Sequence, residues 1–405
     1  MKDIREVLGI KIESPLWDKA YELAQKDSGI PEWLTKEYII NLHEKYDLLR
    51  DNYECIADAA QYVADNPELC MLAKTIYYIL GERKGRAASF ISLEFPKAPE
   101  GTENTKGYDF VGIFPVIAHL LPSWREIEKR GVDKDVISDS LAMLDKLFTS
   151  SSQRLGKKGF GEAEFLLYGA AIYINYLVMG RLRFEICPGA QVKFCAFENS
   201  KKEICILMDN VIMHKSGHIL SSFGCEDKEG SFESDFLETD EFFEGYTVDE
   251  NTRLVKRERL RLSKNEWKQI FASGNDAIKL HIPFGGKLDK NECEKSYKRA
   301  KEIFTRCYPE MNFTGFIITC WMLSPIFKEI LSEESNIVSF GRKYITFPCK
   351  SPATDAYMYV FGFKGQNLKE LDFENLPESN SIMRGLKQKG LKGEFAHEFS
   401  GFSPF

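Results

Sequence analysis

The hydrophobic pattern changes part-way along this chain of 405 residues, and the change constrains the fold more than any other feature of the sequence. The first 150 residues carry helical patterns and no run in which apolar and polar residues alternate. From residue 181 onward, alternating runs such as "RLRFEI" are mixed with helical patterns. The sequence therefore predicts a helical N-terminal domain followed by an α/β or α+β domain.

A small, polar and glycine-rich stretch, "TSSSQRLGKKGFGEAE", separates the two patterns at residues 149–164. We therefore expect one domain over residues 1–152 and a second over residues 153–405. The apolar run that follows, "FLLYGAAIYINYLVMG", is short for a membrane span and contains Asn175. It favours a buried helix over residues 162–179.

Start and stop signals give the expected elements of both parts. A helix is expected to begin at Thr35 as its N-cap, and the next at Asn66, with Pro67 in its first position. After residue 181 the runs predict a β-meander. Later strands are expected at residues 278–283, 315–320, 337–347 and 356–363, with helices at 289–307, 325–331 and 377–391.

Composition argues against several classes of protein. Hydrophobic residues make up 43% of the chain, which argues against global disorder, and a net charge of −7 argues against a nucleic-acid binder. The ten cysteines form no CxxC motif, and several lie in apolar runs, which favours reduced thiols. The N-terminus lacks the apolar core of a signal peptide. We therefore expect a soluble cytoplasmic protein with no nucleic-acid and no membrane partner.

The stretch "KLHIPFGGKLDKNECEKSYKRAKEIF", from residue 279 to 304, has the order strand, glycine loop, helix. The free N–H groups of the helix start, the close approach allowed by Gly285 and Gly286, and the charge of Lys287 would suit a phosphate. Two other interpretations remain open. The glycines turn the chain only, or Asp289, which forms a capping-box-like pair with Glu292, takes up the same N–H groups.

Two groups near this loop are candidates for acid–base chemistry. His281 shares a strand face with Lys279 and could act as a general base. Glu185 shares a strand face with Arg181 and Arg183 and could take up a proton directly or through water. The alternative for both is the plain polar side of a sheet.

An acidic segment with several phenylalanines, residues 225–251, is followed by a mostly basic one, residues 253–264. The two segments either pair with each other on the surface, or the acidic one forms an exposed lid that attracts a cationic amine. His214 and His218 are four residues apart across a Ser-Gly turn, so no metal site is expected there.

Several stretches together resemble a bacterial family of predicted N-acyltransferases, which has a helical N-terminal domain and a GNAT-like C-terminal domain. The resemblance covers roughly residues 180–341. It is carried by "GRLRFE", "GCEDKEGSF", "FFEGYTV", "LSKNEWKQI", "LHIPFGGKLDKNECEKSYKRAKEIF", "FIITCWMLSPIFKEIL" and "SNIVSF".

The resemblance implies an α+β fold in which the helical N-terminal domain precedes a GNAT-like mixed β-sheet domain flanked by helices. It also implies acyl-CoA as co-substrate. The pantetheine would lie between a fourth strand at residues 278–283 and a fifth at 315–320, which places His281 beside the gap between them. The pyrophosphate would lie on the loop before the helix, formed by Phe284, Gly285, Gly286, Lys287 and Leu288.

The function implied by the resemblance is transfer of an acyl group from acyl-CoA to a small-molecule amine by direct attack. His281 or Glu185 would be the base that deprotonates the ammonium, and Cys320 or Ser324 would protonate the leaving thiolate.

The sequence departs from the pattern of GNAT enzymes at one place. These enzymes commonly carry Q/R-x-x-G-x-G/A at the phosphate loop, where this chain has "HIPFGG". Pro283 also removes a strand-end N–H that could have polarised the acyl carbonyl. The alternative function is therefore a GNAT-shaped ligand-binding or interaction protein that does not catalyse.

Overall fold

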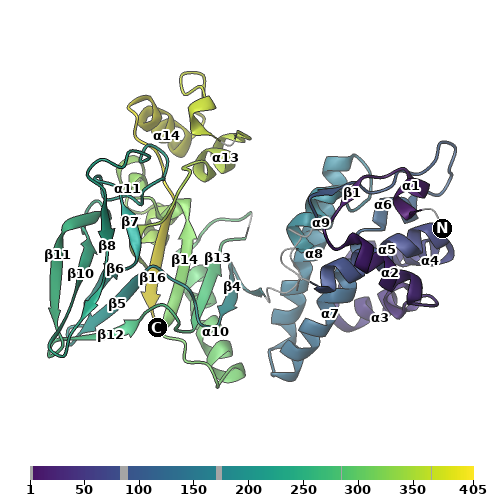
Figure 1. The fold of residues 1–405 in the computed structure, drawn as a ribbon, viewed down its shortest axis with the longest axis horizontal. Coiled ribbons are helices and arrows are strands. Elements are labelled where there is room, and N and C mark those ends of the chain that lie inside the picture. Colours follow the sequence, from purple (N-terminus) through teal and green to yellow (C-terminus); the bar gives the residue numbers. More distant parts are fainter. Residues whose placement is uncertain (1–2, 83–89, 170–175, 284, 366) are drawn as a thin grey trace. The chain divides into compact units, whose positions relative to one another are not determined.

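The computed structural model describes residues 3–82, 90–169, 176–283, 285–365 and 367–405. The chain forms two compact units, Met1–Met179 and Gly180–Phe405 (Figure 1). The first is helical and the second combines a mixed sheet with helices, which confirms the predicted fold class.

Helices make up the first unit. They are α1 (Ile4–Leu8), α2 (Trp17–Lys26), α3 (Lys36–Tyr46), α4 (Tyr53–Asp65), α5 (Pro67–Glu82), α6 (Lys106–Phe110), α7 (Ile113–Lys129), α8 (Lys134–Leu155) and α9 (Glu162–Gly169). Short elements join them: η1 (Glu32–Leu34), η2 (Arg50–Asn52), the two-residue strands β1 (Ile12–Glu13) and β2 (Ser92–Leu93), and β3 (Leu177–Met179).

The predicted caps of this unit are confirmed. The Thr35 side chain accepts the N–H of Tyr38 at the start of α3, and the Asn66 side chain accepts the N–H of Leu69 in α5. The single helix expected before Asn66 is instead two helices, α3 and α4. The chain breaks between them because Asp47 and Leu49 adopt left-handed backbone angles that no helix contains.

Strands dominate the second unit. They are β4 (Leu182–Cys187), β5 (Phe194–Asn199), β6 (Ile204–Met208), β7 (Val211–Met213), β8 (Phe232–Ser234), β9 (Leu237–Glu238), β10 (Phe242–Val248), β11 (Val255–Ser263), β12 (Trp267–Phe271), β13 (Ala277–His281), β14 (Gly315–Cys320), β15 (Ile345–Pro348) and β16 (Phe399–Pro404). The helices are α10 (Lys290–Cys307), η4 (Trp321–Leu323), α11 (Ile326–Ile330), α12 (Asn336–Gly341), α13 (Asp355–Phe361), η5 (Leu368–Glu370) and α14 (Ser381–Leu391).

Two sheets pack face to face in this unit. The central sheet has the order β15-β16-β14-β13-β4-β3, and β13 and β14 run parallel while β4 and β16 run antiparallel to them. The second sheet is antiparallel, in the order β11-β10-β6-β5-β12. Buried rings join the sheets: Phe194 contacts Phe347 at 4.4 Å between ring centroids, and Phe271 contacts Phe402 at 5.1 Å.

Helix α10 covers the other face of the central sheet. Its predicted apolar stripe is buried, and Tyr297 and Phe304 from this stripe contact Phe184 on β4. Burying a ring of this size stabilises the fold by about 1.5–3 kcal/mol. The residues of the stripe are Cys293, Tyr297, Ala300, Phe304 and Cys307.

Several of the predicted elements are wrong. Residues 337–347 were expected as one strand, but α12 ends at Gly341 and only the short strand β15 follows. Residues 356–363 were also expected as a strand and lie largely in helix α13. One helix was expected over residues 162–179. The structure describes helix α9 over Glu162–Gly169 and strand β3 over Leu177–Met179, and residues 170–175 between them lie outside the described residues.

The acidic segment is not a lid. It contains β8, β9 and β10, and β10 lies inside the second sheet, between β11 and β6. The ring of Phe243 is 5% exposed and contacts Phe197. The basic strand β11 pairs with β10 instead, and Glu244 lies 2.9 Å from Arg259 and 2.7 Å from Arg261. The other interpretation, that the acidic and basic segments pair with each other, is therefore confirmed.

The glycine-rich stretch at residues 149–164 is largely ordered. Helix α8 continues through it to Leu155, and α9 begins at Glu162. The chain between them is held by Asp109, which accepts the Phe160 N–H through its carbonyl and pairs with Lys157 through its carboxylate. The compact units divide later, after Met179. The division into domains after residue 152 stays a prediction.

Candidate active site

The two parallel strands at the centre of the sheet part from each other after a short contact. β13 and β14 are in register at only two places, Ile278 with Phe316 and Lys279 with Ile317. Beyond these pairs β13 stays on β4 as far as His281, and β14 stays on β16 as far as Cys320. The two strands are described in full, so their carboxyl ends diverge and leave a wedge between them. This wedge lies where the resemblance implied a gap between a fourth and a fifth strand.

A histidine–carboxylate pair lies on one face of the sheet beside the wedge. His281 on β13 and Glu185 on β4 are joined by a 2.7 Å contact between Nε2 and Oε2. Lys279 lies directly opposite Glu185, with its Nζ 3.9 Å from the same oxygen. Because alternate residues of a strand point to opposite faces, this group faces away from α10, which packs on Phe184. The sequence prediction had placed these side chains on strand faces without joining them.

Burial and charge set the protonation of this pair. Desolvation lowers the pKa of His281, and the repulsion from Arg183 and Lys279 adds to it, while the hydrogen bond to Glu185 opposes the shift only in part. Desolvation raises the pKa of Glu185, but the His281 hydrogen bond and the Lys279 charge outweigh it, so that the pKa lies below its ordinary value. The imidazole is therefore neutral, and the carboxylate ionised, at neutral pH.

Two hydroxyl groups lie on the same sheet face across the wedge. Thr319 on β14 and Ser400 on β16 are direct cross-strand partners, and their side-chain oxygens are 2.8 Å apart. Thr319 is two residues after Ile317, which is in register with Lys279, so it shares the face of His281. The sequence analysis missed this pair because it missed β16, whose Gly401 and Pro404 are untypical of a central strand.

Cys320 and Ser324 lie away from this group. Cys320 is next to Thr319 and therefore points to the opposite face, the face covered by α10. Desolvation raises the pKa of its thiol to about 12, so the thiol stays protonated. Ser324 is 5% exposed and follows η4, where its N–H donates to the Trp321 carbonyl. The structure thus places the Cys320 thiol on the opposite face of the sheet from the predicted bases.

The loop after β13 turns sharply before α10. Gly285 and Gly286 have φ of 81° and 74°, a left-handed region that favours glycine, so the turn alone explains both residues. Asp289 accepts the N–H groups of Asn291 and Glu292 and thereby occupies two donors of the helix start. Lys287 is exposed and Leu288 is buried. Phe284, also predicted as a phosphate contact, lies outside the described residues.

A cavity of about 370 Å³ begins beside this loop. It lies between α10 and the end of α12, and three basic side chains, Lys290, Arg342 and Lys343, line it with one acidic side chain, Glu294. The other lining residues are Leu288, Cys293, Tyr297, Ser339, Phe340 and Ser403.

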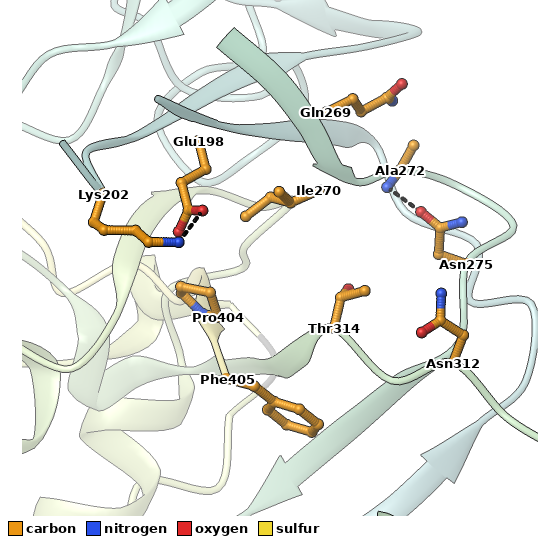
Figure 2. Close-up of a pocket in the computed structure, with 10 residues that line it drawn as sticks. All are labelled: Glu198, Lys202, Gln269, Ile270, Ala272, Asn275, Asn312, Thr314, Pro404 and Phe405. Carbon is orange, nitrogen blue, oxygen red and sulfur yellow. Dashed lines mark hydrogen bonds and ion pairs between the residues drawn. The ribbon is translucent and has the colours of Figure 1, made fainter. Parts of the chain in front are cut away.

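A larger cavity of about 630 Å³ lies at the opposite end of the central sheet. Figure 2 shows Ile270, Thr314 and Phe405 around it, together with the Glu198–Lys202 ion pair and the hydrogen bond between Asn275 and the Ala272 N–H. Thr314 immediately precedes β14, whereas the wedge lies at the other end of that strand. A strand of six residues spans about 20 Å, so the larger cavity is separate from the wedge.

Residues 177–403 match the sequence model of the GNAT-like C-terminal domain, a span of more than half of the chain. The chain belongs to this family. Within its GNAT-like domain, β13, α10 and β14 occupy the places expected for the fourth strand, the third helix and the fifth strand. The comparison with curated proteins found no match.

Three solved structures of acyltransferases are similar to this GNAT-like protein over 99% of its chain and 98% of theirs, at 16% identity. They are a complex with decanoyl-CoA and teicoplanin (TM-score 0.58), a mutant in complex with octanoyl-CoA (0.57), and a complex with CoA and 10C-teicoplanin (0.57). At this identity the similarity shows a shared fold.

Within the described residues, no group of three or more His, Cys, Asp or Glu side chains could hold a metal ion. None of the helices formed by these residues is long and apolar enough to cross a bilayer.

Proposed function

We propose that this protein transfers an acyl group from acyl-CoA to an amine by direct attack. The observation that carries the proposal is the wedge between β13 and β14 with the His281–Glu185 pair on one face of it. A wedge between parallel strands leaves main-chain groups without a partner strand, and these can hydrogen-bond a linear ligand such as pantetheine. A neutral histidine beside it can accept the proton of an ammonium group.

The binding of acyl-CoA is supported from two sides. The three similar acyltransferases were crystallised with CoA or acyl-CoA. In this chain the cavity beside residues 285–288 is lined by Lys290, Arg342 and Lys343. Arg342 pairs with Glu333 and Lys343 with Glu294, so within the described residues Lys290 offers the charge that suits a phosphate of CoA. Within the described residues no acceptor lies on the N–H groups of Lys287 and Leu288, which leaves them for a pyrophosphate.

The transfer itself needs no covalent enzyme intermediate. His281 takes a proton from the ammonium, and Glu185 holds the imidazole and stabilises its charged form. The amine nitrogen then attacks the thioester carbonyl, the C–N bond forms, and the carbonyl oxygen becomes an oxyanion. As the oxyanion collapses the C–S bond breaks and CoA leaves as the thiolate. The nitrogen, which became positively charged on attack, gives up a further proton to water, and the neutral amide remains. The Thr319 and Ser400 hydroxyl groups can donate to the oxyanion or to the acceptor.

The Cys320 thiol is a poor source of the proton for the departing thiolate. An ordinary thiol has a pKa of about 8.5, whereas that of Cys320 is raised to about 12, so transfer of the proton is uphill. Water or the protonated His281 is therefore the better final proton donor.

A second candidate function is a GNAT-shaped binding protein without catalysis. The observations that favour it are Pro283, which has no N–H to offer the acyl carbonyl, and Asp289, which already occupies two N–H groups of the helix start. Such a protein would bind CoA or a related ligand and release no free CoA.

One experiment separates the two functions. Purified protein is incubated with acyl-CoAs of two to ten carbons and a panel of small amines, including teicoplanin, the ligand of the similar acyltransferases. Free CoA is measured by chromatography, because thiol reagents would also react with the ten free cysteines. An amide product, absent in His281→Gln, would support the transferase. Binding of CoA without product from any amine would support the binding protein.

A reducing compartment suits this proposal. All ten cysteines are free in the structure, and acyl-CoA is a thioester of the cell interior. We therefore propose that the protein acts in the cytoplasm.

A further inference from the structure

A single arginine holds the loop that precedes α10. Arg181, in the turn between β3 and β4, donates from Nη1 to the Pro283 carbonyl at 3.0 Å and from Nη2 to the Gly286 carbonyl at 3.0 Å. Its Nε donates to the Lys287 carbonyl at 2.9 Å. The planar guanidinium thus binds three carbonyl groups of one five-residue segment, a geometry that the ammonium of lysine cannot reproduce.

The main chain of Arg181 is fixed on α10 at the same time. Its N–H donates to the Ser296 hydroxyl at 3.0 Å, and that hydroxyl donates to the Glu292 carbonyl in the first turn of the helix. Gly180 makes this contact possible, because a Cβ there would lie 3.0 Å from the Ser296 oxygen, and its φ is 64°. Arg181 therefore joins the helix start to the loop that leads into it.

The direction of these hydrogen bonds bears on what the loop can bind. Because Arg181 turns the carbonyl oxygens of Gly286 and Lys287 toward itself, those oxygens do not face a ligand at the loop. Carbonyl oxygens repel phosphate, whereas N–H groups attract it. Because the carbonyl groups of the loop point toward Arg181, its N–H groups can face a ligand on the opposite side.

The positive charge of Arg181 also favours the binding of a phosphate at this loop. Within the described parts of the chain no carboxylate pairs with it, and its contacts are to neutral main-chain groups. Partial burial lowers its pKa from the ordinary value, yet an arginine remains charged at neutral pH. A cation that is not neutralised by a neighbouring acid therefore lies directly behind the loop.

We propose that Arg181 is a positioning residue for acyl-CoA: it shapes the main chain of residues 285–287 so that its N–H groups face the pyrophosphate, and it adds positive charge behind them. The inference rests on the proposed function, since the ligand is the same acyl-CoA. Arg181 does not touch the reacting atoms, so it affects the binding of acyl-CoA and leaves the chemical step alone.

The test compares wild type with Arg181→Gln, Arg181→Lys and a matched control, Arg384→Gln, which changes an exposed arginine on α14. CoA affinity is measured by calorimetry, and kcat and both KM values by product formation. We expect Arg181→Gln to raise Kd and the KM for acyl-CoA about tenfold or more, the effect of losing hydrogen bonds from a charged group. The KM for the amine and kcat should stay unchanged. Arg181→Lys keeps the positive charge but loses the planar guanidinium, so its Kd and its KM for acyl-CoA should lie between those of wild type and Arg181→Gln. The Arg384→Gln control should match wild type.

Two further measurements separate positioning from folding. Methylguanidinium added to Arg181→Ala should restore part of the CoA affinity, which would not occur if the variant were misfolded. Amide hydrogen exchange without ligand should be faster at residues 285–288 in Arg181→Gln than in wild type, and equal elsewhere.

The outcomes also separate this inference from the proposed function. Equal CoA affinity in wild type and all Arg181 variants would overturn the positioning role and leave the proposed function intact. A fall in kcat with no change in the KM for acyl-CoA would overturn it too. Failure of wild type to bind CoA at all would overturn the proposed function and this inference with it.

Discussion

The Nε2 atom of His281 lies 2.7 Å from the Glu185 carboxylate although the two residues are not opposite each other in the sheet. The residue opposite His281 is Arg183, and the one opposite Glu185 is Lys279. The contact is thus diagonal between neighbouring strands, a distance that long side chains can span. It fixes the Nε2 atom of the histidine and thereby orients the imidazole ring.

The pH dependence of the rate tests this pair. Desolvation lowers the pKa of His281, so the base stays unprotonated to below its ordinary pKa of 6.5, and kcat/KM should decline only below that value. Glu185→Gln removes the group that raises the pKa of His281, so the acid limb should move to lower pH as the rate falls. His281→Gln should lower kcat about 10²–10⁴-fold. An acid limb that stays in place in Glu185→Gln would argue against the pairing.

The role of Cys320 is tested by replacing its thiol. Because burial raises its pKa to about 12, transfer of a proton from this thiol to a leaving thiolate is uphill. Cys320→Ser should therefore retain most of the activity, and Cys320→Ala should lose less than tenfold, the effect of about one hydrogen bond. If Cys320→Ala folded normally but lost activity several hundredfold, Cys320 would have to be the general acid.

We expect the stability of the protein at low pH to depend on two adjacent histidines. The rings of His218 and His397 are 4.4 Å apart between centroids, and burial lowers their pKa to about 3 and about 4. Unfolding lets them protonate below pH 6.5, so the free energy of unfolding should fall as the pH drops from 6.5 toward 4. Each histidine should contribute about 1–2 kcal/mol between pH 6.5 and 5.

Urea unfolding at pH 7 and pH 5 measures this effect. His218→Gln should lose less stability than wild type between the two values, because it has one group fewer to protonate. The half-buried His43, which stacks on Tyr53, provides the control as His43→Gln. An equal loss in wild type and His218→Gln would show that these rings do not cause the acid sensitivity.

Local patterns predicted the elements that frame the site, and long-range pairing determined the rest. The stripe of α10 and the order strand, loop, helix were visible because they depend on neighbouring residues. Strand β16 was missed because Gly401 and Pro404 are uncommon in strands, yet pairing with both β14 and β15 holds it at the centre of the sheet.

The same distinction applies to the site residues. His281 and Glu185 could be assigned to polar strand faces, but their contact depends on the register of β13 with β4, which alternation does not specify. Arg181 was grouped with Arg183 and Glu185 on a charged strand face, whereas it lies in the turn before β4 and binds the glycine loop. Residues 225–251 have the charge of a surface loop, but part of the segment alternates like a strand. The burial of Phe243 shows that this part forms a strand of the sheet.

The domain boundary is a separate prediction. The connection between α8 and α9 contains Lys157 and Lys158, both exposed. If residues 149–164 link two domains, trypsin should cut here before it cuts elsewhere, and the two fragments should each resist further digestion. A first cut within the sheets of the second unit, identified by mass spectrometry, would contradict the division.

The central claim is that the loop 284–288 and the wedge bind acyl-CoA, and calorimetric titration of CoA tests it most directly. Wild type should bind one CoA per chain. Gly286→Val should bind more weakly, because its side chain would strain a left-handed turn and press on Arg181, whose Nε lies 3.6 Å from the position of a Cβ there. Lys287→Glu should weaken binding less, because an exposed lysine contributes little. Equal affinity in all three proteins would show that the glycines only turn the chain, and no binding by wild type at millimolar CoA would contradict the account as a whole.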